Sequence, residues 1–365
     1  MITRRGLLRT GLMSFCAIAL SSCDNIERST SSYPLIGSLE HASYCALETQ
    51  GDLPHSRAIF FDESLEKVAT LELPFAMISN GVTVSQVFER SICIAPKGIN
   101  GIAADHYIRL ISAVNGRVSS YDVQVSSLEE CGCNSQYVFS LNNLNGCMNV
   151  IRVNRQTGDL KKIEIKKEHD CSLICTTNDV VTFSQSDSNF DNCYLTHYSL
   201  DLEEIKKVQL EPKYVVVFRP KLIGDKIFFP WYSSSPEPSN DRGFGIYDVK
   251  KKEIQYIKTG KLVYEISGIG DKILVVNQPW NGSSSSNTSL QLYSIEGEAL
   301  SNPTEIDHHV NAITADETSL VIQSEFTLRK YKMENLKISN EPLFEKIIQK
   351  QGREYTFISD FLDIR

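Results

Sequence analysis

The chain has 365 residues, of which 41% are hydrophobic, and it carries 37 lysine and arginine residues against 45 aspartate and glutamate residues, a formal net charge of −8. This length can bury a sizeable core, and the acidic balance argues against nucleic acid as a partner, because binding to phosphate rewards clusters of lysine and arginine. The first residues combine a basic region at Arg4, Arg5 and Arg9 with an apolar run over 11–20. That order predicts an export signal at 1–22.

The end of this segment, Leu20-Ser21-Ser22-Cys23, resembles the lipobox of bacterial lipoproteins. The resemblance implies that the signal is removed and that Cys23 carries lipid such as palmitate, with an anchor and linker over 23–34. It also implies that the protein sits in the bacterial cell envelope, on the periplasmic face of a membrane. The alternative is an uncleaved membrane helix, but the apolar run is shorter than the roughly 18 residues that such a helix needs.

The residues before the apolar run, Thr3-Arg4-Arg5-Gly6-Leu7-Leu8-Arg9, resemble the twin-arginine export motif. The alternative is an ordinary basic region of a signal peptide.

Eight cysteines remain after Cys16 and Cys23 are set aside with the signal and the anchor. An even number in an exported chain predicts disulfide bonds. The candidates are Cys45, Cys93, Cys131, Cys133, Cys147, Cys171, Cys175 and Cys193. Pairing of Cys131-Gly-Cys133 with Cys171-x-x-x-Cys175, and of Cys147 with Cys193, is expected, and zinc binding or thiol redox chemistry is the alternative.

An internal repeat sets the expected fold of 35–365. GDKIFFPW begins at Gly224 and GDKILVVNQPW at Gly270, 46 residues apart, and each copy leads to a strand ending in tyrosine, Tyr247 or Tyr293. A period of about 45 residues is typical of repeat architectures. Seven hairpins follow the chain, with turns near Glu63, Asn115, Thr157, Asp201, Lys250, Glu296 and Glu334.

These hairpins predict an all-β fold, a seven-bladed β-propeller of four-stranded blades. Phe61-Asp62, Tyr198-Ser199, Tyr247-Asp248 and Tyr293-Ser294 resemble the Trp-Asp pairs of WD-repeat proteins, at the end of a third strand. The resemblance is to the WD-repeat-like and quinoprotein-like propeller superfamily, with no specific family. The segments around Tyr44 and 355–358 are expected to close the ring. The rival fold is a pair of two-sheet sandwiches.

Long loops between second and third strands predict a binding face. Trp231-Tyr232 and Trp280-Asn281 open two of these loops, each after a proline, and aromatic rings beside polar side chains can hold a sugar or a peptide. The alternative is that each Pro-Trp pair caps its own blade against water.

The entrances of the innermost strands predict a second candidate site on the propeller axis. They carry His169, Asp170, Arg219, Glu265, His308 and His309. Converging ionisable groups can form a ligand site or tune one another's pKa, although charged residues at strand ends are also often simply solvated. His308 and His309 are not expected to bind one metal together, because adjacent strand residues face opposite sides of a sheet.

Few motifs point to specific chemistry. Asp187, Asn189 and Asp191 copy the start of a calcium loop, but the glycine and the glutamate that complete such a loop are absent, and a solvated loop explains the pattern equally well. The sequence has no nucleophile elbow, phosphate-binding loop, zinc-protease motif or dinucleotide fingerprint. No resident metal or cofactor is therefore expected.

Two functions fit this sequence. The first is a lipid-anchored envelope protein whose propeller is a binding or scaffold module for a protein, peptide or glycan. The second is a propeller enzyme, such as a hydrolase, lactonase or quinone-dependent dehydrogenase, with its site at the channel mouth.

Overall fold

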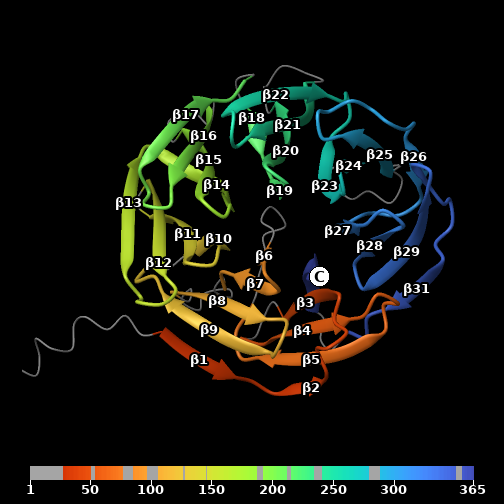
Figure 1. Cartoon of the computed structure of the whole chain (residues 1–365), viewed down its shortest axis with the longest axis horizontal. Coiled ribbons are helices and arrows are strands. Elements are labelled where there is room, and N and C mark those ends of the chain that lie inside the picture. Colours follow the sequence, from red (N-terminus) through yellow and green to blue (C-terminus); the bar gives the residue numbers. More distant parts are fainter. Residues whose placement is uncertain are drawn as a thin grey trace, which may run out of the picture.

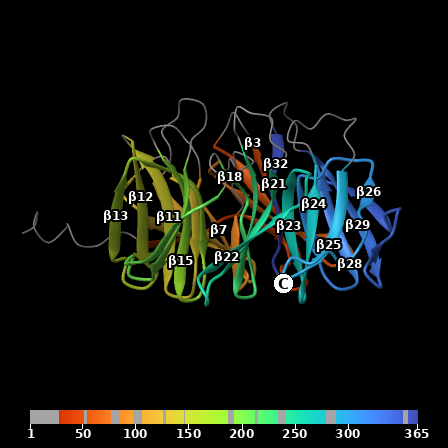
Figure 2. The same cartoon turned by 90° about the horizontal axis from the view of Figure 1, so that it is seen from above.

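Seven antiparallel sheets stand around a central axis and form a β-propeller in the computed structural model (Figure 1). The structure describes residues 28–50, 54–76, 85–96, 106–125, 128–144, 146–186, 192–211, 215–233, 241–278, 288–350 and 356–365. Seen edge-on, the blades form a single layer (Figure 2). The predicted fold is therefore confirmed, and the pair of sandwiches is excluded.

Blades 1 and 2 each contain a strand from elsewhere in the chain. Blade 1 has the order β2-β5-β4-β3-β32, and blade 2 the order β1-β9-β8-β7-β6. Their bounds are β1 (Arg28–Ser32), β2 (Leu35–Gly37), β3 (Tyr44–Gln50), β4 (Ser56–Phe61), β5 (Lys67–Leu73), β6 (Gln86–Phe88), β7 (Ser91–Ile94), β8 (Tyr107–Ser112), β9 (Arg117–Asp122) and β32 (Thr356–Asp363).

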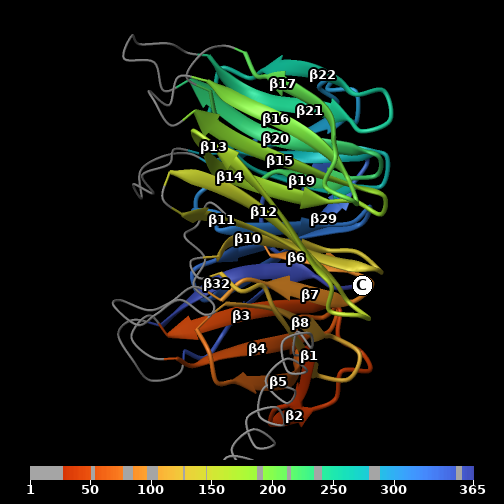
Figure 3. The same ribbon diagram turned by 90° about the vertical axis from the view of Figure 1, so that its left-hand side faces the viewer.

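Blades 3 to 7 follow the chain in order, each running from the axis to the rim (Figure 1). Blade 3 is β10 (Leu128–Cys133), β11 (Tyr137–Leu144), β12 (Cys147–Asn154) and β13 (Leu160–Lys166), and blade 4 is β14 (Glu168–Cys175), β15 (Asp179–Ser186), β16 (Cys193–Ser199) and β17 (Glu204–Gln209). Figure 3 shows these two blades from the side.

Of the remaining blades, blade 6 has four strands, and blades 5 and 7 each have a fifth, short strand. Blade 5 is β18 (Val215–Val217), β19 (Lys221–Ile223), β20 (Lys226–Ser233), β21 (Arg242–Asp248) and β22 (Glu253–Lys258). Blade 6 is β23 (Val263–Ile269), β24 (Lys272–Asn277), β25 (Thr288–Ser294) and β26 (Thr304–Ile306), and blade 7 is β27 (Ala312–Ala315), β28 (Ser319–Ser324), β29 (Thr327–Glu334), β30 (Lys337–Ile338) and β31 (Phe344–Ile347).

The polar residue after each repeated aromatic residue forms the hairpin turn. Asp62 Oδ1 accepts hydrogen bonds from the backbone N–H groups of Ser64 and Glu66, both at 2.9 Å. Asp248 Oδ1 does the same for Lys250 and Lys251, at 3.1 and 2.8 Å. Such side-chain acceptors fix a turn locally, which explains why the pattern recurs along the sequence.

The ring closes through blade 1, as the sequence predicts. The C-terminal β32 pairs antiparallel with β3, from Tyr44 opposite Asp363 to Gln50 opposite Thr356. The N-terminal β1 pairs with β9 at the rim of blade 2. Residues 28–32 therefore belong to the propeller sheet, although the sequence places them in the linker before residue 35.

The core lies between neighbouring blades. Phe183 of blade 4 packs against Phe229 of blade 5, with ring centroids 5.1 Å apart, and Trp231 joins the same buried cluster. Each blade packs one face of its sheet against the preceding blade and the other face against the following blade. The hydrophobic contribution to stability therefore comes from the ring as a whole.

Candidate functional site at the propeller axis

The innermost strands bring four ionisable groups together on the axis, and three of the four are buried. Arg219 lies between β18 and β19, Lys221 on β19, Glu265 on β23 and Asp360 on β32. Arg219, Glu265 and Asp360 are each less than 5% exposed. These groups come from blades 5, 6 and 1, which lie far apart in the sequence but meet at the axis.

Glu265 is the centre of this axial cluster. One of its carboxylate oxygens, Oε2, lies 2.9 Å from Arg219 Nε, and the other, Oε1, forms an ion pair with Lys221 Nζ. Arg219 Nε and Glu265 Oε2 are close enough to form an ion pair, but the angle between them does not fit a hydrogen bond. Two cations on one buried carboxylate offset the cost of removing that carboxylate from water.

The backbone at Arg219 has an unusual conformation, with φ of 45°. A non-glycine residue rarely adopts positive φ, and such residues gather at functional sites. Arg219 and Lys221 are two residues apart, and their side chains have different surroundings. Arg219 Nη1 donates to the backbone oxygen of Asn311 at 2.9 Å, and Lys221 lines the cavity at the other end of the axis.

Asp360 is the carboxyl group of the cluster that titrates abnormally. Its Oδ2 accepts a hydrogen bond from the Ser85 N–H at 2.7 Å. Burial raises the pKa of Asp360 to about 6, although the Ser85 bond and the charge of Arg219 act in the opposite direction. The group therefore changes charge near neutral pH.

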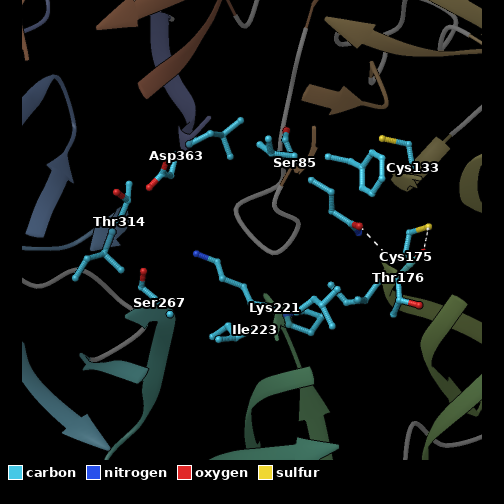
Figure 4. A pocket seen from close by; sticks show the side chains of 18 of the residues that line it. Ser85, Cys133, Cys175, Thr176, Lys221, Ile223, Ser267, Thr314 and Asp363 are labelled. Atoms are coloured by element: carbon cyan, nitrogen blue, oxygen red, sulfur yellow. Dashed lines mark hydrogen bonds between the residues drawn. The ribbon is translucent and has the colours of Figure 1, made fainter. Parts of the chain in front are cut away.

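A cavity of about 520 Å³ lies where the innermost strands end, and all seven blades contribute to its wall. We call it the strand-end cavity. In Figure 4 the Lys221 side chain reaches toward its centre, with Ser267 and Thr314 on one side and Cys175 and Thr176 on the other. Thr314 is 5% exposed, and its Oγ1, which neighbouring atoms cover, has no hydrogen-bond partner among the described residues.

A second cavity, of about 420 Å³, lies where the innermost strands begin, and we call it the strand-start cavity. Arg219 and Tyr264 lie in its wall together with Phe326 and Phe357. The Arg219 guanidinium stands over the Tyr264 ring at 5.0 Å, and the His309 ring lies 5.7 Å from that same ring. The axial cluster thus borders both cavities, with Lys221 in the wall of one and Arg219 in the wall of the other.

The sequence-predicted axial residues are partly brought together. Arg219 and Glu265 form an ion pair, and His309 reaches Arg219 through Tyr264. Burial lowers the pKa of His309, which hydrogen-bonds Gln278 at 3.3 Å. His169 lies on the innermost strand of blade 4 but lines neither cavity.

His308 and His309 lie between β26 and β27, outside any strand, and their side chains contact different groups. Its Nε2 lies 3.3 Å from the Tyr331 hydroxyl, and its Nδ1 lies 3.1 Å from Asp307. The two histidines therefore share no site.

Trp231 is a core residue. Its side chain is fully buried, and its ring meets Tyr256 edge to face at 5.9 Å. In this position it offers no face to a ligand, in agreement with the blade-cap interpretation. Its neighbour Tyr232 is half-buried and packs against Phe218.

Several predicted site residues lie outside the described residues. They are Cys23, Trp280 and Asn281, and the calcium candidates Asp187, Asn189 and Asp191. Within the part of the chain that the structure describes, no group of three or more His, Cys, Asp or Glu residues is placed to hold a metal ion. The same part contains no helix long and apolar enough to cross a membrane.

The predicted cross-links between cysteines are absent from the structure, where the seven described cysteines are free: Cys45, Cys93, Cys131, Cys133, Cys147, Cys175 and Cys193. Cys131 and Cys133 pack in the cluster between blades 2 and 3, and Cys175 packs in the cluster between blades 3 and 4. Cys133 and Cys175 both line the strand-end cavity, and Cys133 contributes to the raised pKa of Cys175, but the two are not bonded. Cys193 belongs to the cluster between blades 4 and 5, away from the partly exposed Cys147. The Cys171 side chain lies outside the described residues.

Lys221 and Asp360 are site residues that the sequence analysis missed. Lys221 stands two residues after Arg219 and before a Gly-Asp turn, where a solvated lysine is ordinary. Asp360 stands in the segment expected only to close the ring. The one available signal was a carboxylate placed between two apolar pairs, Phe357-Ile358 and Phe361-Leu362.

No protein-family model and no curated protein sequence matches the chain. Its fold is similar to that of a putative 6-phosphogluconolactonase from Bacteroides uniformis, with 11% identity and a TM-score of 0.54 over 84% of this chain and 97% of that one. A second putative 6-phosphogluconolactonase, from Bacteroides fragilis, has 8% identity and a TM-score of 0.53 over 86% and 100% of the two chains. Kluyveromyces lactis Hsv2 has 11% identity and a TM-score of 0.52 over 88% and 100%. At these identities the likeness establishes a β-propeller fold and nothing finer.

Proposed function

We propose that this protein is a lipid-anchored envelope protein whose propeller binds a ligand on its axis, in the strand-end cavity. The proposed ligand is a glycan or peptide that carries a carboxylate or phosphate group. The anchor rests on the resemblance of 20–23 to a lipobox. The binding function rests on the strand-end cavity itself.

The observation that carries the proposal is the position of Lys221 in the cavity wall. A lysine ammonium has three donors, and the Glu265 ion pair uses one direction only. A volume of about 520 Å³ suits a small ligand or the end of a chain. Asp363 also lines the cavity, but its carboxylate pairs with Arg365, so the remaining N–H directions of the Lys221 ammonium favour an anionic group.

The axial cluster favours binding over catalysis. Glu265 is paired with both cations, and Asp360 is held by the Ser85 N–H. A general base needs an accessible lone pair next to its substrate. Carboxylates that already have partners are better suited to holding the wall of a cavity in place.

The test is calorimetric titration of the full chain with glucuronate, 6-phosphogluconate and trialanine. We expect at least one probe to bind, and Lys221→Met to weaken binding about 10-fold or more, since a charge-assisted hydrogen bond contributes roughly 1.5–3 kcal/mol. Lys221→Arg should retain most of the affinity. Lys250→Met is the matched control, because Lys250 pairs with Asp225 on the surface. If no probe binds, or if both lysine-to-methionine variants weaken binding equally, the proposal fails.

A second candidate function is lactone hydrolysis. Two proteins of similar fold carry the name putative 6-phosphogluconolactonase. Hydrolysis of 6-phosphogluconolactone above the spontaneous rate would favour this function over binding alone. A rate equal to the spontaneous one would eliminate this lactone as a substrate.

A further inference from the structure

Three thiols from two neighbouring blades meet in one buried cluster. Cys93 lies on β7 of blade 2, and Cys131 and Cys133 lie on β10, the innermost strand of blade 3. All three are at most 6% exposed and belong to the same hydrophobic cluster. Strand β7 lies beside β10, and Cys93 is close enough to Cys131 and Cys133 for both to contribute to the shift of its pKa.

The strand geometry restricts which thiols can join. Cys131 and Cys133 are two residues apart on one strand, so they project on the same side about 6.6 Å from each other. A disulfide needs Cβ atoms roughly 3.5–4.5 Å apart. The two cysteines of β10 therefore cannot bond to one another without distorting the strand, and Cys93 must supply one sulfur.

Access distinguishes Cys133 from Cys131. Cys133 stands at the end of β10 and lines the strand-end cavity, whereas Cys131 does not. Cys175 also lines that cavity, but it belongs to blade 4, and its thiol donates to the backbone oxygen of Thr176 at 3.4 Å. A small disulfide compound that enters the axis thus reaches Cys133 beside Cys93.

We propose that Cys93 and Cys133 form a disulfide bond under oxidising conditions and that this bond joins blade 2 to blade 3. In the first step the Cys133 thiolate attacks a low-molecular-weight disulfide, a mixed disulfide forms, and one small thiol leaves. In the second step the Cys93 thiolate attacks the Cys133 sulfur and the second small thiol leaves. Two protein thiols lose two protons and two electrons, and one small disulfide is reduced to two thiols.

The pKa values of both thiols bear on the speed of this reaction. Burial raises the pKa of Cys93, and the hydrogen bond to Cys93 together with burial raises that of Cys133. The thiolate is the reacting form, so exchange in the folded protein is slow near neutral pH and faster at alkaline pH or during folding.

The experiment is refolding of the full chain in a buffer of reduced and oxidised glutathione at pH 8.5, followed by thiol blocking, tryptic digestion and mass spectrometry without reduction. The expected product is peptide 91–97, which contains Cys93, linked to peptide 118–152, which contains Cys131, Cys133 and Cys147. The link should persist in Cys131→Ser and Cys147→Ser and disappear in Cys133→Ser, with Cys133→Ala as a second variant in case the serine variant does not fold. Reduction should lower the melting temperature of the wild type by several degrees and leave that of the Cys133 variant unchanged.

Three results would overturn the assignment. They are the absence of a link in the wild type, a link that survives in a folded Cys133 variant, and a link that is lost in Cys131→Ser. None of these results depends on ligand binding in the strand-end cavity, so the disulfide and the proposed function fail separately.

Discussion

The buried Asp360 shows how one residue near the axis sets a pH dependence for the whole fold. Its ordinary pKa is 3.8, and burial raises it to about 6. Between these two values the folded state holds a proton that the unfolded chain has released. The contribution of Asp360 to stability is therefore complete below pH 3.8 and is lost as the pH rises through 6.

The variant Asp360→Asn should remove this dependence. Because asparagine does not titrate and its side-chain oxygen can still accept the Ser85 hydrogen bond, we expect its free energy of unfolding, relative to the wild type, to increase by about 2 kcal/mol from pH 4.5 to pH 7.5. Urea denaturation at the two pH values measures the difference. A difference that does not change with pH would contradict the raised pKa.

A substitution of Trp231 tests whether this residue stabilises the core or binds a ligand. The side chain is fully buried between blades 4 and 5. Trp231→Ala should lower the free energy of unfolding by about 3–5 kcal/mol, because truncation of a buried aromatic residue leaves a cavity. The half-buried Tyr232 is the control, and Tyr232→Ala should cost clearly less in the same urea titration. Equal, small losses for both variants would mean that Trp231 does not support the core.

The sequence allowed only part of the axial site to be predicted. Arg219 and Glu265 stood out as charged residues at strand entrances, and they do meet. Sequence spacing cannot tell which neighbouring residue turns to the axis, so Lys221 was missed while His169 was included. Conformations such as the positive φ of Arg219 depend on tertiary contacts rather than on local propensity.

At the scale of strands and turns, the sequence was more informative. The seven hairpins were predictable because their turns are built locally, by side chains such as Asp248 that accept backbone hydrogen bonds. By contrast, β1 pairs with β9 across about ninety residues of chain, and a polar five-residue segment carries no signal for such a partner.

One of the tyrosines that end the third strands also connects two blades. The Tyr247 hydroxyl of blade 5 lies 2.8 Å from His197 Nδ1 of blade 4, and His197 Nε2 lies 3.3 Å from Asp179 Oδ2. Burial lowers the pKa of His197 despite the neighbouring carboxylate, so the ring is neutral where it contacts Tyr247. Tyr247 thus links blades 4 and 5, whereas the equivalent Tyr293 donates its hydroxyl hydrogen to Gln291 of its own strand.

At the scale of the whole molecule, both ends of the described chain are fixed by strand pairing. The last strand, β32, is the innermost strand of blade 1, and β1 extends the rim of blade 2. A closed ring leaves no long unpaired edge. The strand-end cavity depends on this closure, because one of its seven walls is the C-terminal strand.

The proposed anchor has a geometric consequence for the whole protein. Cys23 and Arg28, where β1 begins, are five residues apart, and an extended chain covers at most about 3.6 Å per residue. A lipid on Cys23 would hold the rim of blade 2 within roughly 18 Å of the anchoring point, by the same chain geometry. In that arrangement blade 2 faces the membrane.

The anchor itself is tested by Cys23→Ser in the full chain, expressed in a bacterium that processes lipoproteins. We expect the variant to move from the membrane fraction to the soluble fraction, because the acyl chains supply the hydrophobic attachment and the acidic propeller has little electrostatic attraction for anionic lipids. Cell fractionation followed by immunoblotting measures the distribution. Cys147→Ser, which changes a partly exposed cysteine of the propeller, is the matched control and should stay with the membrane. Equal membrane association of both variants would show that something other than Cys23 holds the protein there.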